Sequence, residues 1–165
     1  MEEYKIPKEA LENLKDPEVI RRQMEEGKTF QEIIGYTTEA MEKFYRIARK
    51  LFEQQEYRRS ADAFIFMTTL NPMVHSYWLG LGMSEHLDGD YQGALLAYAM
   101  AILTNVENPI PHYHSASCYQ ALGDDESAMG SLEIVIRCAE GKEEHIGLKE
   151  QAVKIKEALK RKGRQ

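Results

Sequence analysis

The chain repeats at a period of 34 residues without a gap, and this period constrains its fold more than any other feature. Three consecutive windows of the 165 residues superimpose: 41–74, 75–108 and 109–142. Internal repeats of this length build solenoids, in which each unit packs only on its neighbours and shares one continuous core with them. The sequence therefore predicts three similar units stacked side by side.

The middle window carries the clearest copy of the repeated motif. Its marked positions are Trp78, Leu81, Gly82, Gly89, Tyr91, Ala94, Tyr98 and Ala101. This order is close to the Trp-x2-Leu-Gly … Ala-x3-Phe pattern of the tetratricopeptide (TPR) repeat, which is a helix–turn–helix unit. The other windows repeat the small and aromatic positions at Gly123, Ala128 and Phe64. The predicted fold class is all-α, with three tandem TPR repeats that form a short superhelical solenoid.

Three segments follow from this repeat. Residues 1–38 precede the solenoid and are expected to form an N-terminal helical and dimerisation region. Residues 39–142 hold the three repeats. Residues 143–165 are expected to form a C-terminal helix that caps the open end of the stack, followed by a basic tail.

The N-terminal region has its own helix signals. Thr29 and Glu32 have the spacing of a capping box, and Thr38 is expected to cap the first repeat helix. The region also has more apolar residues than a body of three repeats has surface to bury, which predicts contact with a second copy of the chain. The expected dimer-interface residues are Val19, Ile20, Met24, Ile33 and Ile34.

The charge and the apolar pattern of the sequence argue against nucleic acids and membranes as partners. The net charge is −6, and no Lys or Arg occurs between Ser60 and Ile136, so the repeats lack side chains that neutralise nucleic-acid phosphates. No apolar run approaches the ~20 residues that a membrane span needs, and the acidic N-terminus does not resemble a signal peptide. Cys118 and Cys138 are expected to stay reduced. These features predict a cytosolic protein that binds other proteins.

Residue patterns that would support catalysis or a cofactor are missing. Gly80-Leu81-Gly82 lies inside a predicted helix and lacks the third glycine of a dinucleotide site. His112 and His114 fall on different faces of a helix, which argues against a shared metal ion. Cys118 has no partner pattern for a nucleophile. We therefore predict no enzyme activity, no catalytic residue, no cofactor and no metal.

The first helix of each repeat predicts the binding surface. If Trp78, Leu81 and Gly82 face the stack, residues one step around the helix face the groove. These positions are Tyr45, Arg49, Phe52, Leu79, Met83, His86, Leu87, Tyr113, Ser117 and Gln120. Several are large and apolar, and an exposed apolar strip marks a binding surface. The alternative is that the N-terminal region folds back and covers the strip.

With these residues in view, the chain resembles the class II chaperones of type III secretion, which hold translocator proteins in the bacterial cytosol. The resemblance is carried by residues 41–45, 76–82, 89–98 and 109–116. It implies a homodimer through the N-terminal helices. It also implies a groove that takes an extended translocator segment with spaced Pro or Val, Leu and Pro anchors.

The resemblance also assigns roles to individual groove residues. Tyr45 and Phe52 match aromatic groove positions of that family. Arg49 and Met100 stand where further aromatic residues would be expected, so Met100 joins the predicted groove. The alternative function is a general TPR adaptor for another peptide ligand, such as an acidic C-terminus held by a clamp of Lys, Asn and Arg. Among the groove positions only Arg49 is cationic, which argues against that clamp.

Overall fold

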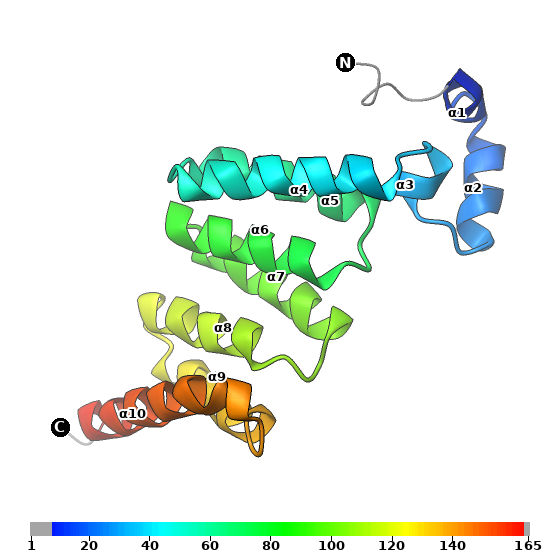
Figure 1. Cartoon of the computed structure of the whole chain (residues 1–165). Coiled ribbons are helices and arrows are strands. Elements are labelled where there is room, and N and C mark those ends of the chain that lie inside the picture. The colour runs from blue at the N-terminus through cyan, green and yellow to red at the C-terminus, as the bar shows by residue number, and fades with distance from the viewer. Residues whose placement is uncertain (1–7, 164–165) are drawn as a thin grey trace.

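The computed structural model describes residues 8–163, and every regular element in this range is helical. Six long helices form three hairpins: α4 (Thr38–Glu53) with α5 (Tyr57–Leu70), α6 (His75–Asp88) with α7 (Tyr91–Thr104), and α8 (Pro109–Ala121) with α9 (Asp125–Cys138). The hairpins stack in chain order, with α4, α6 and α8 along one side (Figure 1). The predicted all-α TPR solenoid is confirmed.

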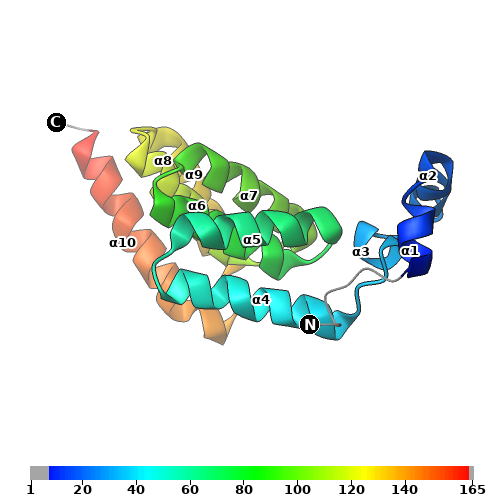
Figure 2. The same ribbon diagram turned by 90° about the horizontal axis from the view of Figure 1, so that it is seen from above.

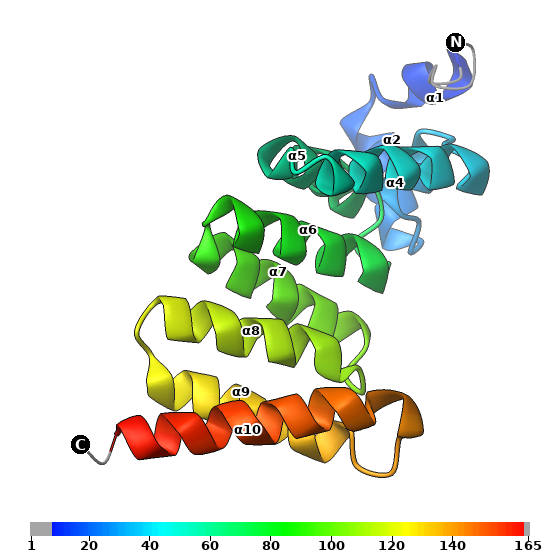
Figure 3. The same cartoon turned by 60° about the vertical axis from the view of Figure 1, so that its left-hand side comes forward.

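Short helices precede the stack, and one long helix ends it. The first three are α1 (Lys8–Asn13), α2 (Pro17–Glu25) and α3 (Phe30–Ile33). Figure 2 shows α1 and α2 standing away from the stack, while α3 lies near its first hairpin. After a 3-10 turn at Glu143–His145, α10 (Ile146–Lys162) packs on α9 at the other end (Figure 3).

Side-chain caps decide where the N-terminal helices begin. At α3 the predicted capping box is present: the Thr29 N–H donates to Glu32 Oε2 at 2.7 Å, and the Glu32 N–H donates to Thr29 Oγ1 at 3.3 Å. At α4 the prediction was wrong by one residue. Thr37, not Thr38, has the extended backbone of a cap, and its Oγ1 accepts the Ala40 N–H at 3.2 Å.

The turns inside the hairpins need a left-handed residue. Gly89 and Gly123 supply it in the second and third hairpins, with φ of 90° and 80°. In the first hairpin the same role falls to Gln55, at φ 62°. Only glycine adopts this conformation without a steric penalty, so the first turn is the most strained of the three.

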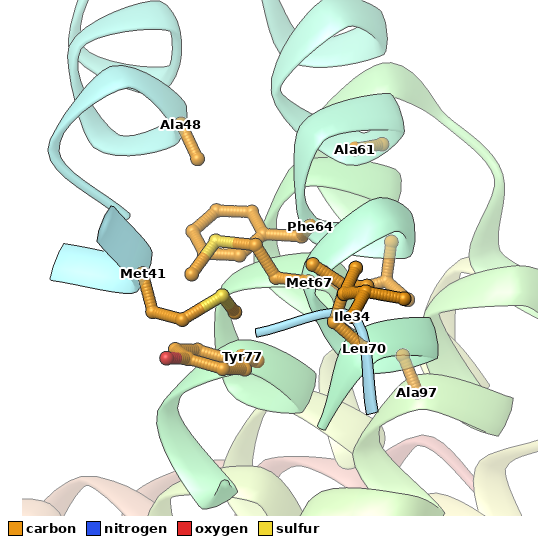
Figure 4. Close-up of a cluster of buried hydrophobic side chains, with 10 residues drawn as sticks. Ile34, Met41, Ala48, Ala61, Phe64, Met67, Leu70, Tyr77 and Ala97 are labelled. Atoms are coloured by element: carbon orange, nitrogen blue, oxygen red, sulfur yellow. The ribbon is translucent and has the colours of Figure 1, made fainter. Parts of the chain in front are cut away.

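The N-terminal region is tied to the first hairpin by its last residues. Ile33 and Ile34 are each 3% exposed, and Ile34 belongs to the cluster that includes Met41, Phe64 and Leu70 (Figure 4). The two isoleucines predicted for the dimer interface are thus buried inside their own chain. By contrast, α2 has no buried residue, and Met24 is 56% exposed.

Helix α6 is held between two aromatic rings that lie against its glycines. A Cβ built on Gly80 would lie 2.3 Å from Phe64 Cζ of α5. A Cβ on Gly82 would lie 2.5 Å from Tyr98 Cε1 of α7. Both rings are almost fully buried. Helices α5 and α7 therefore approach α6 at a distance that only glycine permits.

We predict that Gly82→Ala destabilises the chain by about 1–3 kcal/mol, because the added methyl group overlaps a buried ring that has no free space to move into. Thermal and urea unfolding would measure this loss. Gly130→Ala is the matched control, since Gly130 lies inside α9 with no atom near the new Cβ. It should stabilise the chain by about 0.5–1 kcal/mol. Equal effects at both positions would contradict the close approach.

Candidate peptide-binding groove

The side of the stack formed by α4, α6 and α8, here called the groove face, carries an apolar pocket of about 200 Å³ between α4 and α6. Its lining residues are Tyr45, Arg49, Phe52, Phe64, Ser76, Leu79, Gly80 and Met83. Phe64 reaches the pocket from α5, behind the two front helices. One side of the pocket is open to solvent, so it can receive a side chain from another molecule.

Helical spacing explains why these residues meet. Tyr45, Arg49 and Phe52 are four and three residues apart and so share one face of α4. The residues of α6, from Ser76 through Leu79 to Met83, follow the same spacing on the facing helix. Two helical faces that point toward each other thus form the opposite walls.

Ring contacts hold the aromatic walls in place. The Tyr45 ring lies edge-on to Phe64, with centroids 5.9 Å apart, and lies 6.1 Å from Tyr77. Phe52 makes a T-shaped contact with Tyr57 at 5.5 Å. Such contacts restrict side-chain rotation. The pocket is therefore largely formed before any ligand arrives.

A cluster of rings joins α6, α7 and α8 next to this pocket. The His86 ring lies 5.7 Å from Tyr91 and 6.3 Å from His114, and His114 stacks on Tyr98 at 5.6 Å. Burial lowers the pKa of both histidines, and His86 lowers that of His114 further. Both imidazoles are therefore neutral at physiological pH, and the cluster is an uncharged surface.

Helix α10 bounds the groove face at the third hairpin. The Tyr113 hydroxyl of α8 donates to Gln151 Oε1 of α10 at 3.0 Å. The Tyr113 ring also packs on a cluster that includes Ala152 and Leu159 of α10. The two ends of the groove face thus differ, because the first hairpin is open while the third is partly engaged by the C-terminal helix.

Comparison with known proteins identifies relatives that share this fold. No family model matches the chain. It is 22% identical to low calcium response locus protein H of Yersinia pestis over 136 residues, 82% of this chain and 81% of that protein. Among solved structures, a chain of the CopN-Scc3 complex is 30% identical, with a TM-score of 0.76 over 78% of this chain and 75% of that one.

The type III secretion translocator chaperone SycD of Yersinia enterocolitica, in complex with a peptide of the translocator YopD, is also similar. It matches with a TM-score of 0.75 at 22% identity, over 78% of this chain and 98% of that one. This chain belongs to the class II chaperones of type III secretion. SycD also occurs as a dimer in a further crystal structure.

In this chaperone the structure brings together part of the predicted groove. Tyr45, Arg49, Phe52, Leu79 and Met83 line the apolar pocket between α4 and α6. Two further predicted residues belong to the neighbouring rings: His86 is part of the ring cluster, and Tyr113 contacts His114 of that cluster and Gln151 of α10. Whether any of them contacts a client stays a prediction.

The other predicted groove residues lie outside the pocket. Leu87 is 52% exposed near the end of α6, and Ser117 and Gln120 lie on α8. Met100 lies on α7, which belongs to the other row of helices. Phe64, Ser76 and Gly80 were missed. Ser76 could have been found from its spacing to Leu79 and Met83, whereas Phe64 lies on the second helix of its repeat and so falls outside the helix faces that predicted the groove.

Residues 8–163 contain neither a metal site nor a membrane-spanning helix. No group of three or more His, Cys, Asp or Glu side chains there is arranged to hold a metal ion. No helix in the same range is long and apolar enough to cross a membrane. Cys118 is buried, and burial raises the pKa of its thiol to about 11, which keeps it protonated.

One carboxyl group beside the ring cluster is poorly accommodated. Glu85 Oε2 is buried and has no hydrogen-bond partner among residues 8–163. Burial, together with the nearby Asp90, raises the pKa of Glu85 to about 7, and Arg58 opposes the change. Since the folded pKa exceeds the usual 4.5, the folded chain binds this proton more tightly than the unfolded chain does.

We predict that Glu85→Gln stabilises the chain by about 2 kcal/mol near pH 8, where the wild-type carboxylate is ionised. The gain should shrink as the pH falls through 7 and vanish below about 4.5, where the carboxyl is protonated in both states. Urea unfolding at several pH values would measure it. Asp88→Asn, which removes an exposed carboxylate at the end of the same helix, is the matched control and should not give the stabilisation of Glu85→Gln near pH 8. A pH-independent gain would contradict the raised pKa.

Proposed function

We propose that this chaperone binds an extended apolar segment of a translocator protein on its groove face and keeps the client soluble and unassociated before export. The observation that carries the proposal is the preformed apolar pocket between α4 and α6, open to solvent and walled by Tyr45, Phe52, Leu79 and Met83. A pocket of about 200 Å³ accommodates one or two apolar side chains.

The shape of the groove face favours an extended ligand. Uncharged rings follow the apolar pocket across α4, α6 and α8, from the pocket to the neutral His86–His114 cluster. A folded domain would meet such a narrow strip at one point, whereas an extended chain can place successive anchors along it. SycD, which shares the fold, holds a peptide of a translocator.

We further propose that the chain is a binding protein without enzyme activity and acts in the bacterial cytoplasm. Support comes from its family and from the lining of the pocket, where Arg49 is the one ionised side chain. The general adaptor remains the second hypothesis. It is less favoured because no Lys or Arg between Ser60 and Ile136 is available to clamp an acidic C-terminus from α6 or α8.

The test uses a fluorescein-labelled peptide of about twelve residues that carries Pro, Leu and Pro anchors, and a second peptide with Ser at all three positions. We expect the anchored peptide to raise fluorescence anisotropy and the Ser peptide to bind much more weakly. Phe52→Ala should weaken binding by about thirtyfold, since truncating a buried anchor contact costs about 2 kcal/mol.

Phe66→Ala is the matched control, because Phe66 is an exposed phenylalanine of α5 that does not line the pocket. It should leave peptide affinity unchanged. Circular dichroism would verify that both variants stay folded. Equal affinity for the two peptides, or an equal loss in the two variants, would overturn the proposed groove.

We also propose that the chain forms a homodimer through α2. Its apolar residues Val19, Ile20 and Met24 lie on a helix that has no buried residue and stands apart from the stack (Figure 2). A second copy could bury this surface. SycD, which shares the fold, also occurs as a dimer.

We predict that Ile20→Glu shifts the chain from a dimer to a monomer of 19.0 kDa in sedimentation equilibrium, because a carboxylate cannot be buried unpaired in an apolar contact. Ile47→Glu is the control, since Ile47 is 49% exposed on α4, outside the N-terminal helices. The Ile47→Glu variant should keep the mass of the wild-type dimer. A monomeric wild type, or a dimeric Ile20→Glu variant, would contradict the proposed dimer through α2.

A further inference from the structure

A second hollow adjoins the apolar pocket and differs from it in charge. It measures about 320 Å³ and is lined by Tyr45, Arg46, Arg49, Lys50 and Glu53 of α4. Tyr45 and Arg49 line both hollows, so the two share a wall. We call Arg46, Arg49 and Lys50 the cationic rim.

Few carboxylates of the described residues pair with the cations of the rim. Arg46 and Lys50 make no ion pair with another residue of the described range 8–163. Arg49 pairs with Glu53 at 3.2 Å, but the two side chains are 59% and 63% exposed. A pair this exposed contributes ~1 kcal/mol or less, so Arg49 can exchange Glu53 for a second carboxylate at little cost.

The rim is also electrically distinct from the rest of the groove face. Helices α6 and α8 carry no Lys or Arg, and the imidazoles of His86 and His114 are neutral because burial lowers their pKa. Positive charge on the groove face of the first two hairpins is therefore concentrated on α4. It lies directly beside the pocket that takes an apolar anchor.

Resting on the proposed function, we propose that the cationic rim is a carboxylate subsite: it binds an Asp or Glu side chain of the client next to the residue that fills the apolar pocket. Guanidinium groups bind carboxylates in a bidentate, directional way. In an extended peptide, side chains two residues apart point to the same side, about 6.6 Å from one another. The acidic residue is thus expected two positions from the anchor.

This subsite gives the groove a selectivity that apolar pockets alone cannot give. A client segment with a Lys at that position would face Arg46, Arg49 and Lys50 and be repelled. An amide side chain would bind with neither attraction nor repulsion of charge. The chaperone therefore recognises apolar anchors together with an acidic neighbour.

The test extends the peptide assay with three C-terminally amidated peptides that share the Pro, Leu and Pro anchors. The residues two positions before and after the Leu are Glu, Gln or Lys. At low salt we expect the Glu peptide to bind about tenfold more tightly than the Gln peptide, and the Lys peptide to bind least. A Gln peptide with a free C-terminus tests the chain end as the source of the carboxylate.

Two variants assign the effect to the rim. Arg49→Gln should remove most of the preference for Glu over Gln, and Arg49→Glu should make the Lys peptide the tightest. Arg58→Gln removes another exposed arginine, on α5, that lines neither hollow, and it should keep the full preference. Arg49 and Arg58 are both exposed, so circular dichroism should show all three variants folded at the temperature of the binding assay.

The outcomes separate this inference from the proposed function. If the Glu and Gln peptides bind equally well, and both bind more tightly than the Ser peptide, the subsite is wrong while the groove stands. A loss of preference in Arg58→Gln would show an effect of net charge, which also overturns the subsite. A preference for the free C-terminus over Glu would favour the adaptor. If no anchored peptide exceeds the Ser peptide, both proposals fail.

Discussion

The contact of two aromatic rings with the backbone of α6 is the constraint on which the rest of the structure depends. Phe64 lies against Gly80 and Tyr98 lies against Gly82, so α6 is held from the preceding hairpin and from its own partner helix. Phe64 and Gly80 also line the apolar pocket. The same close approach that orders the stack therefore forms one wall of the candidate site, and the core and the groove are not independent features.

Sequence reasoning succeeded where the period of the repeat decides the outcome. The spacing of small and aromatic residues predicted the hairpins, and the helix period brought Tyr45, Phe52 and their neighbours to one pocket. It failed where distant segments meet. The burial of Ile33 and Ile34 follows from α3 packing on α5, and an apolar pair in a sequence does not reveal whether its own chain or a second copy covers it.

The basic C-terminal helix and the acidic repeats partly neutralise each other in the folded chain. Lysines of the basic α10 pair with acidic residues of α9: Lys156 contacts Glu133 and Lys162 contacts Asp125, each at 2.7 Å. Burial of Leu159 and Ala152 completes the junction. The C-terminal helix therefore caps the stack with charges that suit the acidic repeats, while the cations of α4 stay on the groove face at the opposite end.

The long stretch between Arg59 and Arg137 has a practical consequence for anyone who maps a bound client. Helices α6, α7 and α8 offer no amine to lysine-directed cross-linkers and no cleavage site to trypsin. A standard cross-linking and mass-spectrometry experiment would therefore return no information from the middle of the groove, however tightly a client is bound there. Carboxylate-directed cross-linkers and a protease that cuts after acidic or aromatic residues would make this region visible.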